Sequence, residues 1–319
     1  MLDIFYEIRD DLGKVEEMLK EVVQAPEKTM TETALHLINA GGKRLRPAFC
    51  LLGAKFHNYH LPTVLPLAVA LELIHMASLV HDDVVDAATT RRGVPTVKAM
   101  WGNRFSTHLG DFLFARSLVL ISQYSNPLIP RVLARTSVQM TEGEIVQIAT
   151  SFDPQQTVKD YFYRIKRKTA LLIAASCQLG AVACGAPPSI YMALRRFGHY
   201  IGMAFQITDD ILDMTADEAR LGKPLGSDMR QGILTLPVIF ALQGPHGAEL
   251  KQMVTRRDKS QAEIERAIDL VVSCGAVEKA NRVVGRYIDK ARRQLLDLPD
   301  IPARRTMAII AEFIIQRKF

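Results

Sequence analysis

The sequence has few of the residues that mark secreted, metal-clustering or nucleic-acid-binding proteins. It carries only four cysteines among 319 residues, Cys50, Cys177, Cys184 and Cys274, and their spacing matches neither a zinc motif nor a disulfide framework. We find no secretory leader pattern, so we expect a cytoplasmic protein with reduced thiols. The formal charge of +6 is mild and spread along the chain, and no basic surface interleaved with aromatic residues is evident. A nucleic-acid-binding module is therefore not expected.

The sequence also lacks strand pairs of alternating polarity, strong hairpin turns and low-complexity linkers. Helical periodicity fills most of the chain instead, and the prolines lie mostly between helical segments or at their starts. With 48% hydrophobic residues, the chain can form a sizeable core. We therefore predict one all-α domain over residues 1–319. The expected helices cover residues 1–24, a segment capped by Thr31 and ending near Leu37, and then 47–57, 64–86, 104–122, 131–150, 158–184, 189–213, 234–242, 261–273, 276–296 and 303–316.

A long apolar stretch, residues 61–80, has the length needed to cross a membrane. Pro62, Pro66 and Glu72 interrupt it and acidic residues follow it, so we expect no membrane span. Alanine, leucine and methionine favour helix, and an apolar covering on nearly all sides is typical of a helix in a protein interior. We therefore predict a buried core helix.

Three aspartates, Asp82, Asp83 and Asp86, stand at the end of this apolar run. Positions four apart share a helix face, so Asp82 and Asp86 should project together with Asp83 beside them. Three carboxylates on so short a segment repel one another unless a cation lies between them, and oxygen ligands suit Mg²⁺, which completes its shell with water and phosphate oxygens. Arg91 and Arg92 follow, with the forked geometry that suits phosphate. An acidic cap on the next helix, or a solvated face, would explain a single cluster at least as well.

The same pattern occurs a second time at Asp209, Asp210 and Asp213, again below an apolar helical run. Both clusters place aspartates at positions i, i+1 and i+4. Two such helices facing each other would hold several Mg²⁺ ions and a diphosphate between them. The repetition therefore favours a metal site over two solvated faces.

Further motifs give the chain a resemblance to a known family. The segments GGKRLRP at 41–47, HDDVVD followed by RRG at 81–93, and FQITDDILD followed by GKPLGSD at 205–228 are similar to motifs of the trans-type polyprenyl diphosphate synthases. The match also includes HLGDFLFARSL, TEGEIVQ, RKTALLI and LTLPV, so it extends over most of the chain, and it is nearest to long-chain bacterial members. The resemblance implies an isoprenoid-synthase-type helical bundle around a central cavity, with both aspartate motifs at its mouth.

The activity that this resemblance implies joins an allylic diphosphate, expected to be farnesyl diphosphate, to successive isopentenyl diphosphates. The expected product is a long all-trans polyprenyl diphosphate of heptaprenyl length, for use in a quinone side chain. Mg²⁺ held by Asp82, Asp86 and Asp209 would stabilise the leaving diphosphate, with Asp83, Asp210 and Asp213 supporting the metal shell. The positions that match the family's allylic diphosphate site are Arg91, Lys168, Thr169, Gln206 and Lys223, and those that match its isopentenyl diphosphate site are Lys43, Arg46, His75 and Arg92.

The residues before Asp82 predict the length of the product. His75 lies about two helical turns back on the same side; alone it would more often be a hydrogen-bonded core histidine than a substrate ligand. Ala77 and Ser78, with Ile74 one turn behind Ser78, occupy the first steps of a path along this face. One turn advances about 5.4 Å, close to the length of an isoprene unit, so small side chains here predict a product longer than farnesyl. Close packing of two helices would also explain them.

Ile233 departs from the family pattern, because many members carry a lysine there. The change removes one cation from the expected allylic site and leaves open whether the chain is active alone. A homodimer and a heterodimer with a small regulatory component are both compatible with the sequence. A class I terpene cyclase would share one aspartate helix but needs no second diphosphate pocket. A non-catalytic subunit should have eroded acidic motifs, and here both are intact.

Overall fold

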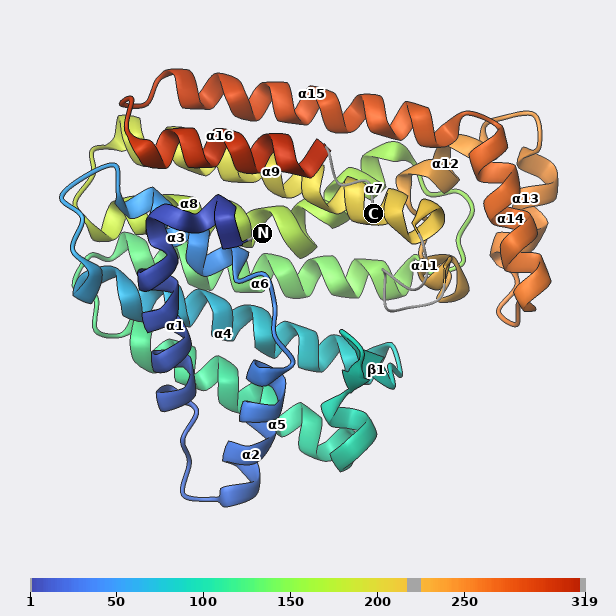
Figure 1. Cartoon of the computed structure of the whole chain (residues 1–319). Helices are drawn as coiled ribbons and strands as arrows, with labels where there is room; N and C mark the ends of the chain where they lie inside the picture. Colours follow the sequence, from blue (N-terminus) through green and yellow to red (C-terminus); the bar gives the residue numbers. More distant parts are fainter. Residues whose placement is uncertain (1, 217–224, 316–319) are drawn as a thin grey trace. The chain divides into compact units, whose positions relative to one another are not determined.

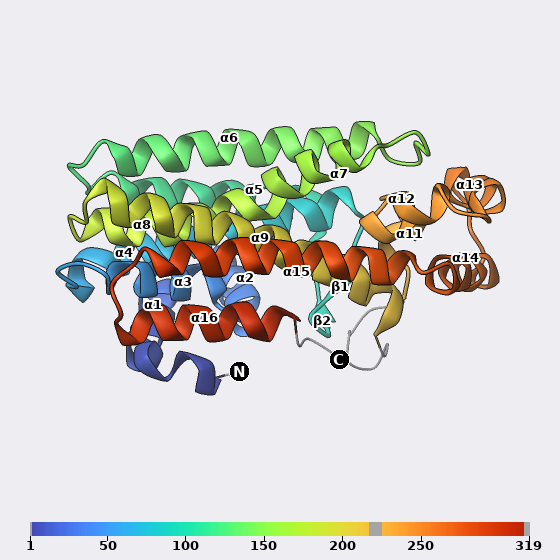
Figure 2. The same cartoon turned by 90° about the horizontal axis from the view of Figure 1, so that it is seen from above.

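The computed structural model describes residues 2–216 and 225–315, and it confirms the predicted all-α class (Figures 1 and 2). Helices account for nearly all regular structure in these two ranges. In chain order the elements are η1 (Leu2–Ile8), α1 (Arg9–Val22), α2 (Lys28–Asn39), α3 (Leu45–Ala54), α4 (Leu61–Val85), β1 (Thr90–Arg91), β2 (Val94–Pro95), α5 (Val97–Ile121), α6 (Leu128–Ala149), α7 (Val158–Ile165), η2 (Lys166–Ala170), α8 (Leu171–Ala183), α9 (Pro188–Thr215), α11 (Ser227–Arg230), α12 (Leu236–Leu242), α13 (Gly247–Thr255), α14 (Gln261–Ser273), α15 (Ala276–Leu296) and α16 (Pro302–Ile315).

The described chain forms two compact units. The first comprises Met1–Ser137, Leu172–Gly198 and Leu295–Ala308, and the second comprises Val138–Leu171, His199–Gln294 and Ile309–Phe319. Helices α6, α8, α9, α15 and α16 each contribute residues to both units. That the whole chain acts as a single domain stays a prediction.

Helix α4 is the core of the first unit and lies beside α5 (Figure 1). It begins at Leu61, earlier than predicted, because proline is tolerated in a first helical turn and Pro62 stands there. Among the described residues it is the one helix long and apolar enough to cross a membrane, but 67% of its most apolar window is buried in the fold. Its polar residues Glu72 and Asp83 are buried as well. This burial supports the prediction of a core helix.

Helices α3 and α8 approach each other closely in the first unit, where Gly53 and Gly180 face the opposite backbone. A Cβ atom on Gly53 would lie 2.4 Å from the carbonyl oxygen of Cys177, and one on Gly180 would lie 1.9 Å from that of Cys50. Both distances are far shorter than a van der Waals contact. Glycine at both positions is therefore what allows the two helices to pack at this separation.

The first two helices also differ from the sequence prediction at their starts. Thr31 is not the cap of α2, because the helix begins at Lys28 and Glu27 accepts a hydrogen bond from the backbone N–H of Thr29 at 3.2 Å. Thr31 lies inside the helix and its hydroxyl oxygen accepts from the N–H of Ala25 at 3.0 Å. The amino-terminal helix is also divided, with a 3₁₀ segment through Ile8 before α1.

A short hairpin and one turn of π-helix were missed by the sequence analysis. β1 and β2 pair antiparallel, with Arg91 opposite Val94, and the turn between them places Arg92 and Gly93 in the left-handed region at φ 54° and 79°. The predicted continuous helix over 158–184 is interrupted by the π-helical segment η2. Such segments are often found at functional sites, and this one carries Lys168 and Thr169.

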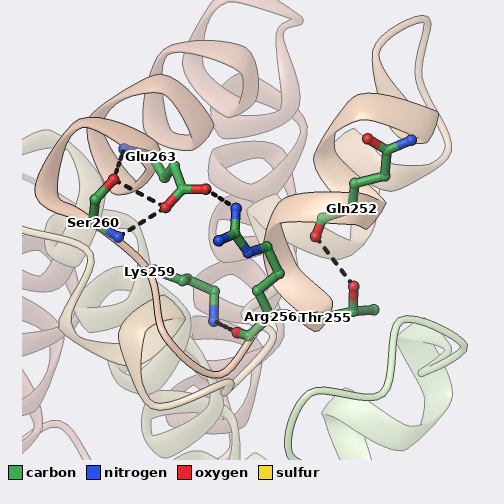
Figure 3. A network of polar contacts seen from close by, with 6 residues as sticks. All are labelled: Gln252, Thr255, Arg256, Lys259, Ser260 and Glu263. Carbon is green, nitrogen blue, oxygen red and sulfur yellow. Dashed lines mark hydrogen bonds and ion pairs between the residues drawn. The ribbon is translucent and has the colours of Figure 1, made fainter.

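Helices α12, α13 and α14 lie together in the second unit (Figure 2), and α13 was not predicted. Helix α14 begins with a capping box, in which Glu263 accepts from the N–H of Ser260 at 2.9 Å and the Ser260 hydroxyl accepts from the N–H of Glu263 at 3.3 Å. Figure 3 shows Arg256 reaching Glu263, and the Lys259 ammonium donating to the carbonyl oxygen of Arg256 at 2.5 Å. These bonds fix the connection between α13 and α14.

Candidate functional site

The first aspartate cluster occupies the carboxyl end of α4, in the first unit. Asp82 and Asp83 lie in its last turn, Asp86 is the C-cap, and the N–H of Asp86 donates to the carbonyl oxygen of Asp82 at 2.8 Å. The cluster is therefore not an acidic cap at the start of a helix. The helix dipole places negative charge at this end, so each carboxylate here is disfavoured by about 0.3–1 kcal/mol unless a cation is near. The position of the cluster thus favours cation binding.

Asp83 differs from its neighbours because it is buried and paired. Its Oδ1 accepts from Arg91 Nε at 2.8 Å and from Arg91 Nη2 at 2.6 Å. The hairpin brings Arg91 back onto the end of α4, eight residues after Asp83. Asp82 and Asp86 are half-buried, one turn apart. In the first unit Asp83 therefore orients Arg91, while Asp82 and Asp86 form the carboxylate pair.

The GGKRLRP segment is held in place by the side chain of Arg44. This residue adopts a left-handed backbone conformation at φ 45°, and its buried guanidinium donates to Glu16, to Glu72 Oε1 at 3.2 Å and to the carbonyl oxygen of Ile38 at 3.0 Å. Because the Arg44 side chain is committed to α1 and α4, the basic residues on either side of it, Lys43 and Arg46, occupy a fixed stretch of backbone.

Arg92 and His75 lie in the same region of the first unit as this segment. The Arg92 guanidinium is so close to Gly42 that a Cβ atom there would lie 2.7 Å from Nη1. Burial, followed by the positive charges of Arg46 and Arg92, lowers the pKa of His75 well below its ordinary value. The imidazole is therefore neutral, and the positive charge of the nearby arginines favours binding of an anion. Of the predicted isopentenyl diphosphate residues, Arg46, His75 and Arg92 are thus brought together, and Lys43 is exposed beside Gly42.

The three residues proposed to control chain length lie on α4, in the two turns before Asp82. Ile74 and Ala77 are buried, and Ser78 is half-buried. The Ser78 hydroxyl donates to the carbonyl oxygen of His75 at 2.8 Å, within its own helix. Its hydrogen is therefore satisfied without a partner from another element.

The second aspartate cluster lies near the end of α9, in the second unit. Asp210 is buried, and both of its carboxylate oxygens accept hydrogen bonds, Oδ2 from the Tyr161 hydroxyl at 2.6 Å and Oδ1 from Gln206 Nε2 at 2.8 Å. Burial and the nearby Asp228 raise the pKa of Asp210, to about 7, in opposition to these two donors. Asp213 is buried too, and its Oδ2 accepts from the backbone N–H of Asp228 at 3.2 Å. Asp209 is half-buried.

The π-helical segment η2 supplies two predicted substrate residues of the second unit. Lys168 is half-buried and forms an ion pair with Glu144 at 2.8 Å. Thr169 is buried and donates to Gln206 Oε1 at 2.6 Å. Thr169 and Gln206 are thus in direct contact, and Gln206 links Thr169 to Asp210.

The remaining predicted positions lie between α9 and α12. Lys223 is outside the described residues. Ile233, which replaces the lysine expected from the resemblance, is half-buried, and its N–H donates to the carbonyl oxygen of Asp228 at 2.8 Å.

Four residues that matter to this geometry were missed by the sequence analysis, namely Arg44, Glu72, Tyr161 and Asp228. In the sequence, Glu72 is distinguished only as a polar residue inside an apolar run, and Arg44 only as one basic residue of the GGKRLRP segment. A buried tyrosine needs a partner for its hydroxyl, but the sequence does not indicate which one.

The arrangement of the carboxylates bears on whether they can bind Mg²⁺. In residues 2–216 and 225–315, no group of three or more His, Cys, Asp or Glu side chains is gathered closely enough to hold a metal ion. Mg²⁺ does not require such a group, because it usually binds through one or two carboxylates and completes its shell with water and phosphate oxygens. Asp82 with Asp86 in the first unit, and Asp209 in the second, are of this kind. The donors fit an ion that arrives with a diphosphate.

Comparison with known proteins gives consistent matches. A family model described as polyprenyl synthetase matches residues 27–271. The chain is 49% identical over 312 residues to heptaprenyl diphosphate synthase component 2 of Geobacillus stearothermophilus, covering 98% of this chain and 97% of that one. Among solved structures, it is similar to a polyprenyl synthase from Caulobacter crescentus CB15 complexed with calcium and isoprenyl diphosphate (35% identity, TM-score 0.95, 100% and 98% coverage). It is also similar to heptaprenyl diphosphate synthase from Staphylococcus aureus (34% identity, TM-score 0.93, 98% and 99% coverage).

Proposed function

Because this chain belongs to the polyprenyl synthetase family, we propose that it condenses an allylic diphosphate with isopentenyl diphosphate, repeatedly and with trans geometry. It is a transferase of prenyl groups, and neither a terpene cyclase nor a non-catalytic subunit is favoured. One observation supports the proposal above all others. Two aspartate clusters stand near the carboxyl ends of two long helices, and each unit also carries basic residues for a diphosphate.

The first unit would bind isopentenyl diphosphate. Arg46 and Arg92 offer positive charge and hydrogen bonds to a diphosphate. His75, whose pKa both arginines lower, is neutral, and Lys43 adds an exposed ammonium. Arg44 is excluded from this role because its guanidinium is bound to Glu16 and Glu72.

The allylic diphosphate would be bound by the aspartate clusters through metal, with Lys168, Gln206 and Arg91 adding donors. In the proposed reaction, the bond between C1 of the allylic group and its diphosphate breaks. The double bond of isopentenyl diphosphate then attacks C1, and one proton passes to the released diphosphate, which restores an alkene. The protein's residues hold both diphosphates, orient the two carbons and exclude water, and no protein nucleophile is required.

The proposed metal is Mg²⁺, held by Asp82, Asp86 and Asp209. When bound, it would offset the charge that develops on the leaving diphosphate. The similar polyprenyl synthase from Caulobacter crescentus CB15 is complexed with calcium and isoprenyl diphosphate, which supports the proposal of a divalent cation.

The proposed product is heptaprenyl diphosphate made from farnesyl diphosphate. The relatives with heptaprenyl products support this length, as do the small residues Ala77 and Ser78 behind Asp82. The name component 2 indicates a partner for the Geobacillus relative. We propose that this chain likewise acts in the cytoplasm as a dimer, either with a second copy or with a small regulatory component.

The test is incubation of the full chain with farnesyl diphosphate, labelled isopentenyl diphosphate and Mg²⁺, alone and with candidate partner chains. We expect label in a polyprenyl diphosphate whose length is read by chromatography after dephosphorylation. A hydrocarbon released without incorporation of label would identify a cyclase instead. No label in any product, with or without a partner, would refute the proposal.

A further inference from the structure

Thr169, Gln206, Asp210 and Tyr161 form one continuous hydrogen-bonded chain inside the second unit. The Thr169 hydroxyl donates to Gln206 Oε1 at 2.6 Å, Gln206 Nε2 donates to Asp210 Oδ1 at 2.8 Å, and the Tyr161 hydroxyl donates to Asp210 Oδ2 at 2.6 Å. Tyr161, Asp210 and Thr169 are 0%, 4% and 6% exposed. Gln206 is half-buried, so it is the member through which the chain can reach a ligand.

The donors and acceptors of this hydrogen-bonded chain follow one direction, which is set by the carboxylate of Asp210. Tyr161 Oη and Gln206 Nε2 both donate to Asp210, which is the arrangement that an ionised carboxylate requires, because it can only accept hydrogen bonds. Gln206 then turns its carbonyl oxygen toward Thr169, which uses the single hydroxyl hydrogen of Thr169. One N–H of Gln206 remains available, whereas Thr169 keeps only acceptor lone pairs. A diphosphate accepts hydrogen bonds, so in this arrangement Gln206 is the donor and Thr169 acts through it.

Tyr161 is suited to hold this arrangement. It comes from α7 while Asp210 comes from α9, so its hydroxyl joins two helices of the second unit. Its ring is fully buried, with the Arg164 guanidinium 5.6 Å from the ring centroid. Arg164 is itself fixed by Gln156 at 2.7 Å and by the carbonyl oxygen of Leu234 at 2.6 Å. The tyrosine oxygen therefore has little freedom to move away from Asp210.

We propose that Tyr161 is a positioning residue for the allylic diphosphate: its hydroxyl fixes Asp210, and Asp210 orients Gln206 so that one amide N–H faces the ligand. This inference rests on the proposed function. It gives Asp210 the part of an orienting group rather than that of a metal ligand.

The chain offers a matched control for Tyr161→Phe. Tyr59 also donates its hydroxyl to an aspartate, Asp11 Oδ2, at the same distance of 2.6 Å, but in the first unit, and neither Tyr59 nor Asp11 is among the residues proposed to bind substrate. Both substitutions remove one such hydrogen bond and keep the ring. We expect Tyr161→Phe to raise the KM for farnesyl diphosphate about tenfold, the effect of losing one well-oriented hydrogen bond. The KM for isopentenyl diphosphate should change less than about twofold, and Tyr59→Phe should leave both unchanged.

A binding measurement without turnover completes the test. Calorimetric titration of the full chain with inorganic diphosphate and Mg²⁺ should show about tenfold weaker binding for Tyr161→Phe only. If Tyr161→Phe does not fold, Asp210→Asn tests the same point, because its amide turns a donor toward one of the two existing donors. The inference would be overturned if the wild type is active and the folded Tyr161 or Asp210 variant has the same KM values and the same diphosphate affinity as Tyr59→Phe. A wild type that is inactive both alone and with candidate partner chains would instead refute the proposed function.

Discussion

Asp82 and Asp86 lie one turn apart at the carboxyl end of α4, and no basic residue occupies the last turn of that helix. Asp83, which lies between them in sequence, forms an ion pair with Arg91 from the hairpin. The neighbouring residues Asp82 and Asp83 are therefore in different electrostatic environments. The pattern of aspartates was visible in the sequence because spacing within a helix is local. The pairing of Asp83 with Arg91, and of Asp210 with Tyr161, was not, since both depend on how the chain folds back.

Asp82→Asn and Asp209→Asn should each lower kcat about a hundredfold or more while the protein stays folded. The reason is that a carboxylate which anchors a divalent cation contributes several kcal/mol to stabilising the departing diphosphate. Steady-state kinetics at saturating Mg²⁺ measures the effect. Asp269→Asn, an exposed carboxylate on α14, is the control and should retain near-normal activity. Comparable activity in all three variants would refute the paired-aspartate site.

The two proposed diphosphate sites should respond to different arginines. Arg46→Ala should raise the KM for isopentenyl diphosphate more than the KM for the allylic substrate. Arg91→Lys should do the reverse, because lysine cannot reproduce a bidentate contact. Lysine is preferred to alanine here, since removing the partner of buried Asp83 would cost about 3–5 kcal/mol of stability. Equal effects on both substrates would show that the two sites have been misassigned.

His75 should make stability depend on pH. Burial, and then Arg46 and Arg92, lower the pKa of His75 in the folded state, so only the unfolded chain takes up this proton as the pH falls below about 6.5. The stabilising contribution is therefore present above that pH and is lost below it, by at most about 1.4 kcal/mol per pH unit. Urea unfolding at pH 7.5 and 5.5 should show a smaller decrease for His75→Asn than for wild type, while exposed His108→Asn follows wild type. An unchanged decrease in His75→Asn would contradict a neutral His75.

At the scale of elements, the long helices were predictable and their interruptions were not. The continuous apolar run of α4 located that helix within a few residues of its observed start and end. The π-helical segment η2 was missed because KRKTA has no composition that distinguishes it from α-helix. The hairpin was missed because each strand has only two residues, and its register follows from the Asp83–Arg91 and β1–β2 contacts rather than from alternation.

The face of α4 that carries Ala77 and Ser78 should set the length of the product. Ala77→Tyr or Ser78→Phe places a ring one turn behind Asp82, where it would stop a growing chain after few additions, since each turn advances about 5.4 Å. We expect products of farnesyl or geranylgeranyl length with condensation largely retained, as analysed by chromatography. Val119→Phe, at an exposed position of α5, controls for adding a ring elsewhere. A folded, active variant that still makes the full-length product would show that the chain does not grow along this face.

At the scale of the molecule, each compact unit carries one aspartate cluster and its own cations. The first has Arg46, Arg91 and Arg92, and the second has Lys168. Motifs spread over most of the sequence made the family predictable, whereas the exposed surface of α6 has no recognisable motif.

On helix α6, Val138, Ile145 and Ile148 are 59%, 61% and 52% exposed and share one face.

This apolar face of α6 should take part in association with another chain. Ile145→Lys should lower the molar mass measured by sedimentation velocity, or abolish co-purification with a partner chain, because a charge at the centre of an interface must be desolvated. Val272→Lys on α14, also at an exposed apolar position, should leave association unchanged. If Ile145→Lys associates as wild type does, the contact between chains lies elsewhere.

The crossing of α3 and α8 limits which sequences this fold can accept. At Gly53 and Gly180 the opposing backbones leave room for a hydrogen atom and nothing larger. Even a methyl group would have to push two rigid helices apart, and a close-packed interior transmits such a shift to its neighbours. Helix α3 follows directly on the segment that holds Lys43, Arg44 and Arg46, so the displacement would reach the proposed isopentenyl diphosphate site. In a saturation-mutagenesis library, positions 53 and 180 should therefore tolerate only glycine, although neither residue is proposed to bind a substrate.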